Sequence, residues 1–324
     1  MAVKDPLLTL LEERRGSYLS GEEIAGKLGV TRASVWKAVK ALRQEGYAIE
    51  AVNNRGYRLG GNEDILSAAG IRRCLGPSEN SFLVETFPTV GSTNALLKER
   101  AAAGAGEGTV IAASEQTAGR GRFGRSFYSP GNTGLYISLL LRPKLPAGDA
   151  AMLTTAAAVA VCKAIEAFSP EQPSIKWVND VLVRGRKICG ILTEAAVDLE
   201  SGGVDYMIVG TGINVYPPEN GFPPELEGIA GPLFSTPQPD QKNQLAASFL
   251  TAFMEYYHAL DTGAWLSDYR KRCHILGMPI LVLAPDGAKE ATALDVDDRC
   301  RLLVRYPDGT QAALSSGEIS VRPR

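Results

Sequence analysis

Histidine is scarce in this chain of 324 residues, where only His258 and His274 occur. So small a number argues against a catalytic triad built on histidine and against a metal site with several histidines. Cysteine is also sparse, and the five residues lie far apart, at positions 74, 162, 189, 273 and 300. An odd, scattered set is typical of free thiols in a reducing compartment, rather than of a disulfide framework or a zinc site.

Long hydrophobic runs are absent as well. No apolar stretch approaches the roughly 20 residues that a membrane-spanning helix needs, and the first residues lack the basic-then-apolar order of a signal peptide. We therefore expect a cytoplasmic protein with no membrane partner. Hydrophobic residues nevertheless make up 45% of the chain, enough to bury a core, and the length predicts about two or three domains.

The charge is uneven along the chain, although the net charge is only −2. Residues 1–60 contain ten Lys and Arg against seven Asp and Glu, a balance of +3. The remainder contains 24 against 29, a balance of −5. A basic head on a mildly acidic body is a weak indication that the head contacts nucleic acid.

Residues 1–62 are predicted to form a winged helix-turn-helix domain. Ser20 begins a capping box for one helix, and Thr31 is the expected N-cap of the next, which runs to about residue 44. This last helix has an apolar stripe at helical spacing, made by Val35, Val39 and Leu42. A hairpin with strands at 47–52 and 57–59 follows, and Gly60-Gly61-Asn62 is the first candidate linker.

The helix-turn-helix at residues 21–40 carries a basic, acid-free surface. No acidic residue occurs from Thr31 to Arg43, and Arg32, Lys37 and Lys40 lie off the apolar stripe. These side chains are the expected contacts to a major groove or its phosphates, with Arg55 and Arg58 on the hairpin as further contacts. The alternative is a winged helix used for protein contact. We favour DNA binding because the helix lacks acidic residues.

The middle of the chain alternates strands and helices, whereas the end is all strand. The pattern predicts a central α/β domain with a mixed sheet over residues 63–274. Its expected strands are 82–87, 109–114, 135–141, 174–177, 181–183, 187–197 and 206–215, and its helices 92–103, 152–168, 242–260 and 264–272. Residues 275–324 are predicted to form a small SH3-like barrel from strands at 279–284, 291–296, 301–306, 311–314 and 319–321, with hairpin turns at Asp286-Gly287 and Asp308-Gly309.

A glycine-rich loop at residues 119–125 contains three arginines among three glycines. It matches G-x-G-x-x-G formally, but no helix follows and no acidic residue lies near 20 positions further on, so a dinucleotide fold is rejected. Guanidinium groups on a flexible loop suit a polyanionic ligand, because their paired N–H groups match phosphate and carboxylate oxygens. From the residues alone, a solvated surface loop or an RNA-binding patch remains an equal alternative.

Two further segments place polar groups at strand ends. In Lys176-Trp177-Val178-Asn179-Asp180, the lysine is able to neutralise a phosphate and Asp180 to hold Mg²⁺ or orient a neighbour. The segments around Lys187 and Gly190, and around Gly210 and Asn214, have glycines against which a ligand is able to lie. The alternative is a pair of buried strands with an exposed salt bridge. The co-occurrence with the arginine loop favours a ligand site.

Together these residues resemble the family of bifunctional biotin operon repressors and biotin–protein ligases, over essentially the whole chain. The resemblance rests on the winged helix, the Gly91-Ser92-Thr93-Asn94 helix start, the arginine loop, the Lys176 and Lys187 segments, Gly212-Ile213-Asn214-Val215 and the terminal Gly317-Glu318-Ile319-Ser320. This chain departs from the family at Val178, where proline is usual, and at Phe123, where a basic residue is common. Neither departure removes a group needed for activity.

The resemblance implies a biotin–[acetyl-CoA-carboxylase] ligase that makes biotinyl-5′-AMP from biotin and ATP and transfers biotin to a lysine of a biotin carboxyl carrier protein. It assigns Ser92, Thr93, Asn94 and Gln116 to the biotin head group. It assigns Arg120, Gly121 and Arg122 to the biotin carboxylate and the phosphate, Lys187 to the carboxylate and Lys176 to the α-phosphate. Asn214 is expected near the adenine, and Gly190 and Gly210 are expected to admit the biotin ring and tail.

The resemblance also implies a biotin-responsive repressor that binds operator DNA, and a homodimer when the adenylate orders loop 119–125. Two other functions are weighed against it. One is a biotin-sensing repressor without ligase turnover, which the intact set of basic residues argues against. The other is a lipoate or octanoate ligase, which shares the general fold but seldom carries a winged helix.

Overall fold

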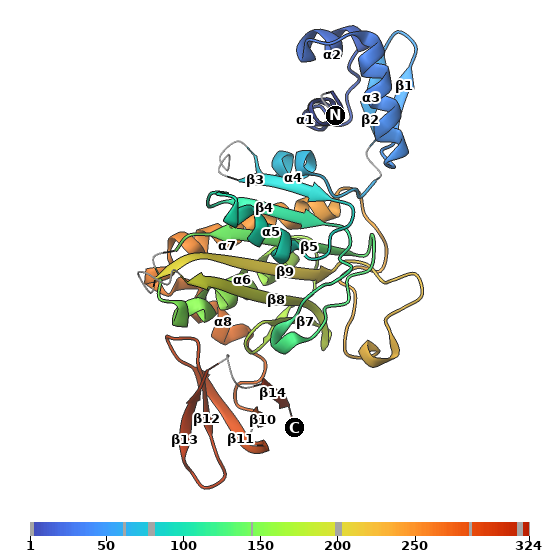
Figure 1. Cartoon of the computed structure of the whole chain (residues 1–324). Helices are drawn as coiled ribbons and strands as arrows, with labels where there is room; N and C mark the ends of the chain where they lie inside the picture. The colour runs from blue at the N-terminus through green and yellow to red at the C-terminus, as the bar shows by residue number, and fades with distance from the viewer. Residues whose placement is uncertain are drawn as a thin grey trace.

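Three bodies follow one another along the molecule in the computed structural model (Figure 1). The structure describes residues 3–60, 63–76, 82–143, 145–197, 203–284, 287–315 and 320–323. The linker residues Gly61 and Asn62, the turn residue Asp286 and the Gly317–Ile319 part of the terminal motif lie outside the described residues. None of the described helices is long and apolar enough to cross a membrane.

The first body is the predicted winged helix-turn-helix. Its helices are α1 (Lys4–Glu13), α2 (Gly21–Leu28) and α3 (Arg32–Gln44), and its wing is the hairpin of β1 (Ile49–Val52) and β2 (Gly56–Leu59). The predicted caps are confirmed, since Ser20 accepts from the Glu23 amide and Thr31 from the Ser34 amide. β1 begins at Ile49 rather than at Tyr47, because the Tyr47 amide still closes the end of α3 by donating to the Leu42 carbonyl.

Gly56 is the residue that lets the wing pack on the helices. Its φ is +97°, and a Cβ there would lie 2.0 Å from the Leu19 carbonyl oxygen. Leu19 and Tyr57 exchange backbone hydrogen bonds at this point, both 2.8 Å long. A side chain at position 56 would therefore break the contact between the wing and the segment before α2.

The second body is a seven-stranded mixed sheet in the order β3-β4-β5-β9-β8-β7-β6. Its strands are β3 (Leu83–Phe87), β4 (Thr109–Ala113), β5 (Gly134–Leu141), β6 (Ser174–Lys176), β7 (Asp180–Val183), β8 (Arg186–Val197) and β9 (Val204–Asn214). β3 and β4 are parallel, and every other pairing in this sheet is antiparallel. The two longest strands, β8 and β9, therefore lie side by side near the middle.

Helices cover both faces of this sheet. One face carries α6 (Ala150–Glu166) and α7 (Gln241–His258), with α4 (Ala68–Leu75) and α8 (Ala264–Arg272) beside them, over the large core. The other face carries α5 (Thr93–Ala102) over a small cluster of Leu97, Ala101, Ile111, Leu140 and Ile208. Most of that second face is left for loops, and the candidate site lies there.

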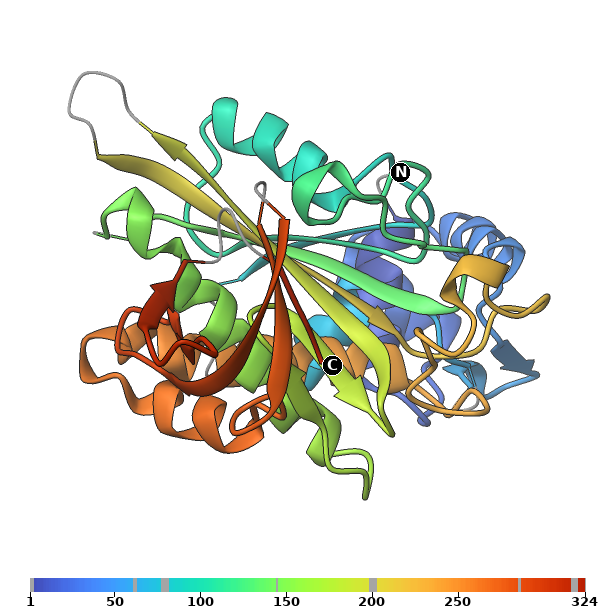
Figure 2. The same cartoon turned by 90° about the horizontal axis from the view of Figure 1, so that it is seen from below.

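The third body is a five-stranded antiparallel sheet, seen from below in Figure 2. Its order is β13 (Gln311–Leu314), β12 (Leu302–Arg305), β11 (Gly287–Val296), β10 (Pro279–Ala284) and β14 (Ser320–Pro323). β11 starts at Gly287 instead of residue 291, because it pairs with β10 back to Ala284. In the part of the chain that the structure describes, no pairing joins β13 to β14, so the sheet is open there.

The two outer bodies join the central one differently. Apolar residues of the third body, such as Ile280 and Leu302, belong to the same core cluster as α6 and α7. The first body has a core of its own, to which the central body adds Ala69 of α4. The two bodies are otherwise joined by ion pairs, from Arg73 to Glu12 at 3.1 Å and from Arg15 to Asp240 at 3.7 Å.

Candidate active site

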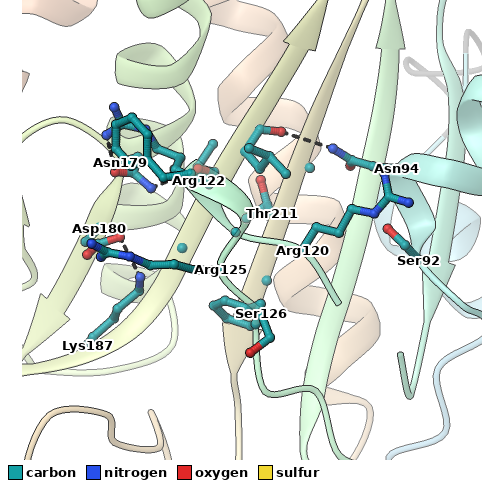
Figure 3. Close-up of a pocket in the computed structure, with 18 of the residues that line it drawn as sticks. Ser92, Asn94, Arg120, Arg122, Arg125, Ser126, Asn179, Asp180, Lys187 and Thr211 are labelled. Carbon is teal, nitrogen blue, oxygen red and sulfur yellow. Dashed lines mark hydrogen bonds and ion pairs between the residues drawn. The ribbon is translucent and has the colours of Figure 1, made fainter. Parts of the chain in front are cut away.

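The glycine-rich loop, the start of α5 and strands β6 to β9 enclose a cavity of about 160 Å³ (Figure 3). It brings together every residue that the sequence predicted for the ligand site except Asn214. The lining includes Ser92, Thr93, Asn94, Gln116, Arg120, Gly121, Arg122, Lys176, Asp180, Lys187, Gly190 and Gly210. Residues that are far apart in the chain therefore share one cavity.

The N-terminus of α5 forms one end of the cavity. Ser92 is the N-cap residue, as predicted, and its hydroxyl accepts from the Ala95 amide. The Thr93 amide and hydroxyl both point to the Gln116 Oε1, at 2.9 and 3.1 Å. The Gln116 Nε2 in turn donates to Ser129 at 3.1 Å. This end is uncharged, rich in oriented hydrogen-bonding groups, and suited to a neutral polar head group.

Asn94 is fixed by the protein itself. Its Nδ2 donates to Glu194 Oε2 at 2.8 Å and to the Leu192 carbonyl at 3.2 Å, and Ser138 lies 2.6 Å from its Oδ1. A Cβ at Gly210 would lie 2.0 Å from that Oδ1. The glycine at 210 is therefore required by Asn94, a reason that the sequence did not reveal, and a direct contact of Asn94 with a ligand stays a prediction.

The glycine-rich loop is held by its own backbone. The Gly121 amide donates to the Arg125 carbonyl at 2.7 Å, and the Phe127 amide to the Gly119 carbonyl at 2.9 Å. Phe123 sits in the turn with a φ of +57° and has an exposed ring. This turn directs the flanking arginines apart, so that Arg120 lies toward Ser92 and Arg122 toward Asn179 (Figure 3).

Arg122 is anchored on the segment between β6 and β7. Its Nη1 donates to Asn179 Oδ1 at 3.1 Å, and Asn179 Nδ2 donates to the Ile191 carbonyl at 3.0 Å. Burial lowers the pKa of the Arg122 guanidinium, although the nearby Asp180 acts in the opposite direction. A desolvated cation at the wall of a cavity favours an anionic ligand.

Lys187 and Asp180 form an ion pair of 2.7 Å at the same wall (Figure 3). Asp180 opens β7 and pairs across the strands with Lys176, the last residue of β6. Its carboxylate is thus engaged by a lysine, and within the described residues no group of three acidic, histidine or cysteine side chains is placed to hold a metal ion. The engagement of Asp180 by Lys187 fits the orienting role that the sequence offered as an alternative, and a contact of Asp180 with Mg²⁺ stays a prediction.

Phe127 is a cavity residue that the sequence analysis missed. A Cβ at Gly190 or Gly212 would lie 2.9 or 2.6 Å from its ring, and the Lys187 ammonium lies 5.9 Å from the ring centre. Gly190 therefore accommodates an aromatic ring of the protein, whereas a ligand was expected against it. The available signal was an aromatic residue directly after the arginine loop.

Asn214 lies outside the cavity lining. It is buried at the end of β9, and its Nδ2 reaches the Lys187 carbonyl at 3.5 Å. Its contact with a nucleotide stays a prediction.

The predicted DNA-facing side chains lie on the outer surface of the first body. Arg32, Lys37 and Lys40 are exposed on α3, beside Trp36, whose side chain is 55% exposed and lies 5.7 Å from the Lys40 ammonium. On the wing, Arg55 and Arg58 stack on Tyr18, and Arg58 also pairs with Glu50 at 2.5 Å. Arg55 has no carboxylate partner within the part of the chain that the structure describes, unlike Arg58.

Three family models match the chain in succession. An HTH domain matches residues 5–58, the Biotin/lipoate A/B protein ligase family matches residues 86–214, and the Biotin protein ligase C terminal domain matches residues 275–322. Among solved structures, biotin protein ligase from Aquifex aeolicus in complex with biotin and ATP is similar, with a TM-score of 0.62 and 26% identity. That similarity covers 74% of this chain and 99% of the other.

Relatives with curated names agree with these matches. The bifunctional ligase/repressor BirA of Bacillus subtilis is 40% identical over 228 residues, covering 70% of each chain. BirA of Escherichia coli is 27% identical over 98% of this chain and 97% of its own length. The biotin--[acetyl-CoA-carboxylase] ligase of Mycobacterium tuberculosis is 32% identical over 73% of this chain and 88% of its own. The chain therefore belongs to the biotin protein ligase family, among the bifunctional ligase/repressors.

Proposed function

We propose that this protein is an ATP-dependent biotin–protein ligase that also represses transcription in response to biotin. The observation that carries the ligase function is the cavity itself. It combines uncharged hydrogen-bonding side chains at α5, toward which Arg120 points, with a cationic wall made by Arg122, Lys176 and Lys187 (Figure 3). A neutral ring system with a carboxylate tail, next to a triphosphate, has the matching distribution of charge.

The first step joins two anions. A biotin carboxylate oxygen attacks the α-phosphorus of ATP, the bond from that phosphorus to the bridging oxygen breaks, and pyrophosphate leaves. Because both reactants are negatively charged, catalysis consists mainly of positioning and charge neutralisation. The Lys187 ammonium and the Arg122 guanidinium line the same wall and supply that positive charge.

The residues divide between the two ends. Ser92, Thr93, Asn94 and Gln116 face the biotin head group, with Gly190 and Gly210 beside it, where the missing side chains admit Phe127 and Asn94. Arg120, Gly121 and Arg122 enclose the carboxylate and phosphate, with Lys187 at the carboxylate, Lys176 at the α-phosphate and Asn214 toward the adenine. Magnesium accompanies ATP in the reaction, and Asp180, which is paired with Lys187, is the residue that would hold it or orient its neighbour; no step depends on that ligation.

In the second step a lysine amine of a biotin carboxyl carrier protein attacks the acyl carbon of biotinyl-5′-AMP. The amide bond forms, the bond to the phosphate oxygen breaks, and AMP leaves with the proton going to solvent or phosphate.

We further propose functional units at residues 1–62, 63–274 and 275–324, closure of the last into an SH3-like barrel, and a cytoplasmic location.

The repressor function rests on the exposed basic face of α3. Arg32, Lys37 and Lys40 are oriented away from the core stripe, where they are available to operator DNA. One winged helix offers few phosphate contacts, so a monomer is expected to bind weakly, and two copies on a palindromic site bind more tightly. We propose that adenylate binding orders loop 119–125 and promotes a homodimer, lowering the entropy cost of association.

A thermal-shift screen distinguishes the ligase from its alternatives. Biotin, lipoate and octanoate are each tested with Mg²⁺ and ATP on the full chain. We expect the largest increase in melting temperature with biotin plus ATP, since the adenylate bridges both ends of the cavity. A larger shift with lipoate or octanoate would identify the other ligase class. A shift with biotin that ATP does not enlarge would favour a sensor without turnover.

Arg122→Gly tests the role of the loop. Loss of a charge-assisted contact of roughly 1.5–3 kcal/mol should speed dissociation of biotinyl-5′-AMP by about tenfold or more. Free adenylate and unselective lysine acylation are the expected signs, measured by rapid filtration and mass spectrometry. Retention of the adenylate at the wild-type rate would show that Arg122 does not hold it.

Lys37→Ala and Lys40→Ala test the DNA face. Each change should weaken operator binding and reduce its salt dependence, because a phosphate contact is lost. Adenylate synthesis by the same proteins should be unchanged. If synthesis falls instead, the proposed division near residue 62 is mistaken.

A further inference from the structure

The segment between β6 and β7, whose residues Trp177 and Asn179 line the cavity, is held by two buried hydrogen bonds. The indole N–H of Trp177 donates to the Cys300 carbonyl at 3.0 Å, and the Tyr269 hydroxyl donates to the Val178 carbonyl at 3.1 Å. All of these groups are buried. Cys300 belongs to the third body and Tyr269 to α8, so the support comes from outside the cavity.

The turn that supplies the Cys300 carbonyl is itself tightly bonded. It connects β11 to β12, and Cys300 has a φ of +61°. The Cys300 amide donates to the Asp297 carbonyl at 2.8 Å, and the Asp297 carboxylate accepts from the Arg299 and Arg301 amides at 3.0 and 2.9 Å. These bonds fix the position of the carbonyl to which Trp177 is attached.

The supported segment carries or anchors three of the five cations that line the cavity. Lys176 directly precedes Trp177 in the chain. Arg122 is anchored on the Asn179 side chain at 3.1 Å, and Lys187 on the Asp180 carboxylate at 2.7 Å. A displacement of residues 177–179 would therefore move or release the groups that face the carboxylate and the phosphate.

We propose that Trp177 is a positioning residue through which the C-terminal domain sets the place of these cations for adenylate formation, with Tyr269 as a second support. The inference rests on the proposed ligase function. It also gives the C-terminal domain a part in the chemistry, although that domain contributes no residue to the cavity lining.

The test compares two tryptophans in the full chain. Trp177→Phe removes the indole donor to Cys300. Trp265→Phe is the control, because Trp265 is also buried and donates at 3.0 Å, but to Thr155, whose hydroxyl lies 3.2 Å from the Cys300 Sγ, so that the bond from Trp177 to the Cys300 carbonyl is kept. Biotin-dependent pyrophosphate release is measured at varied ATP and at varied biotin, together with the melting temperature of each protein.

We expect both variants to melt at similarly reduced temperatures, since each loses one buried hydrogen bond. Trp177→Phe should lower kcat by about tenfold and raise KM for ATP, because a small misplacement of positioning groups has large kinetic effects. Its KM for biotin should stay within about twofold of wild type, since the α5 end of the cavity is untouched. Trp265→Phe should stay within about twofold in all three constants.

Equal kinetics for the two variants would overturn the role of Trp177. If Trp177→Phe does not fold, Tyr269→Phe takes its place, and the same pattern of lowered kcat with unchanged KM for biotin is expected. Wild-type kinetics in Tyr269→Phe would then overturn the inference. A wild-type protein that releases no pyrophosphate with biotin would overturn the proposed function itself, so the two failures are distinguishable.

Discussion

The N-terminal domain meets the central domain through ion pairs beside a small apolar contact at Ala69, whereas the C-terminal sheet meets it through a continuous apolar core. At the first junction, Glu12 of α1 is nearly fully buried and accepts from Arg15 at 3.0 Å and from Arg73 at 3.1 Å. Arg73 also contacts Asp240, the residue before α7. At the second junction, Ile280, Val282 and Leu302 are completely or almost completely buried against the helices of the central domain.

The difference teaches which parts of the chain form one folding unit. A shared apolar core links the stability of two sheets, because burial of either surface depends on the other. A polar junction between two separate cores allows one domain to unfold while the other remains folded. We therefore expect the central and C-terminal domains to form one folding unit, and the winged helix to unfold separately from it.

Deletion of either end of the chain is expected to give the largest difference between the two junctions. A chain without residues 275–324 should lose its cooperative unfolding transition, because the shared core loses one wall. A chain without residues 1–60 should keep a cooperative transition, since its main core is intact. Calorimetry of both fragments measures this. A cooperative transition in the first fragment and none in the second would reverse the comparison.

A matched pair of leucines tests whether the N-terminal core and the shared core are separate. Leu42 and Leu302 are both 0% exposed, one in the N-terminal core and one in the shared core. Replacement of either by Ala should cost about 2–5 kcal/mol of unfolding free energy. Hydrogen exchange should show the loss in α3 alone for Leu42→Ala, and throughout the β8–β9 pair for Leu302→Ala. Destabilisation of both regions by either change would mean a single core.

Glu12→Gln tests the polar junction directly. Removing the carboxylate leaves Arg15 and Arg73 facing each other with only Asp240 between them. We expect a loss of about 2 kcal/mol in protection of the N-terminal domain, less than the roughly 3–5 kcal/mol of a fully buried pair, because both arginines are partly exposed. Glu13→Gln, on the exposed face of the same helix, is the control. Equal losses of protection in the two variants would show that the ion pairs of Glu12 do not stabilise this junction.

Two carboxylates give the smallest effect, and of opposite sign: Asp64, which follows the N-terminal domain and accepts from Lys242, and Asp297, in the turn that supplies the Cys300 carbonyl. Burial raises the pKa of Asp64, so its contribution to stability is present at low pH and is lost as pH rises through its folded-state pKa. Burial opposes ionisation of Asp297, but hydrogen bonds from Arg301 and nearby amides lower its pKa. Its contribution is present above the unfolded value and is lost as pH falls through the folded one.

Urea unfolding of wild type, Asp64→Asn and Asp297→Asn between pH 3 and 7 measures both contributions. On acidification, the amount by which the unfolding free energy of wild type exceeds that of Asp297→Asn should shrink. The unfolding free energy of wild type relative to that of Asp64→Asn should instead rise. Parallel curves for the two comparisons would show that these groups do not titrate as their surroundings indicate.

Much of the fold was predictable because its signals are local. Ser20, Thr31 and Ser92 cap the helices that they were expected to begin, since an N-cap needs only a side chain and an amide three residues away. The resemblance supplied the residues of the site, and all but Asn214 line one cavity.

The unpredicted features depend on residues distant in the chain. Gly210 is required by Asn94, and Gly190 accommodates Phe127, contacts fixed by the strand order β5-β9-β8 and not by neighbouring residues. The ion pair of Asp180 with Lys187 depends on the register of β7 with β8. The hydrogen bond from Trp177 to Cys300 spans 123 positions, and no local spacing indicates it.

Biotin-dependent release of pyrophosphate from ATP by the purified full chain is the most direct test of the central claim. With Mg²⁺ present and no carrier protein, we expect a burst of about one pyrophosphate per active site, followed by slow turnover, because the adenylate stays enclosed by the arginine loop. Addition of a biotin carboxyl carrier protein should then discharge the adenylate and restart release. Pyrophosphate release that does not depend on biotin, or none at all from folded protein, would contradict the assignment.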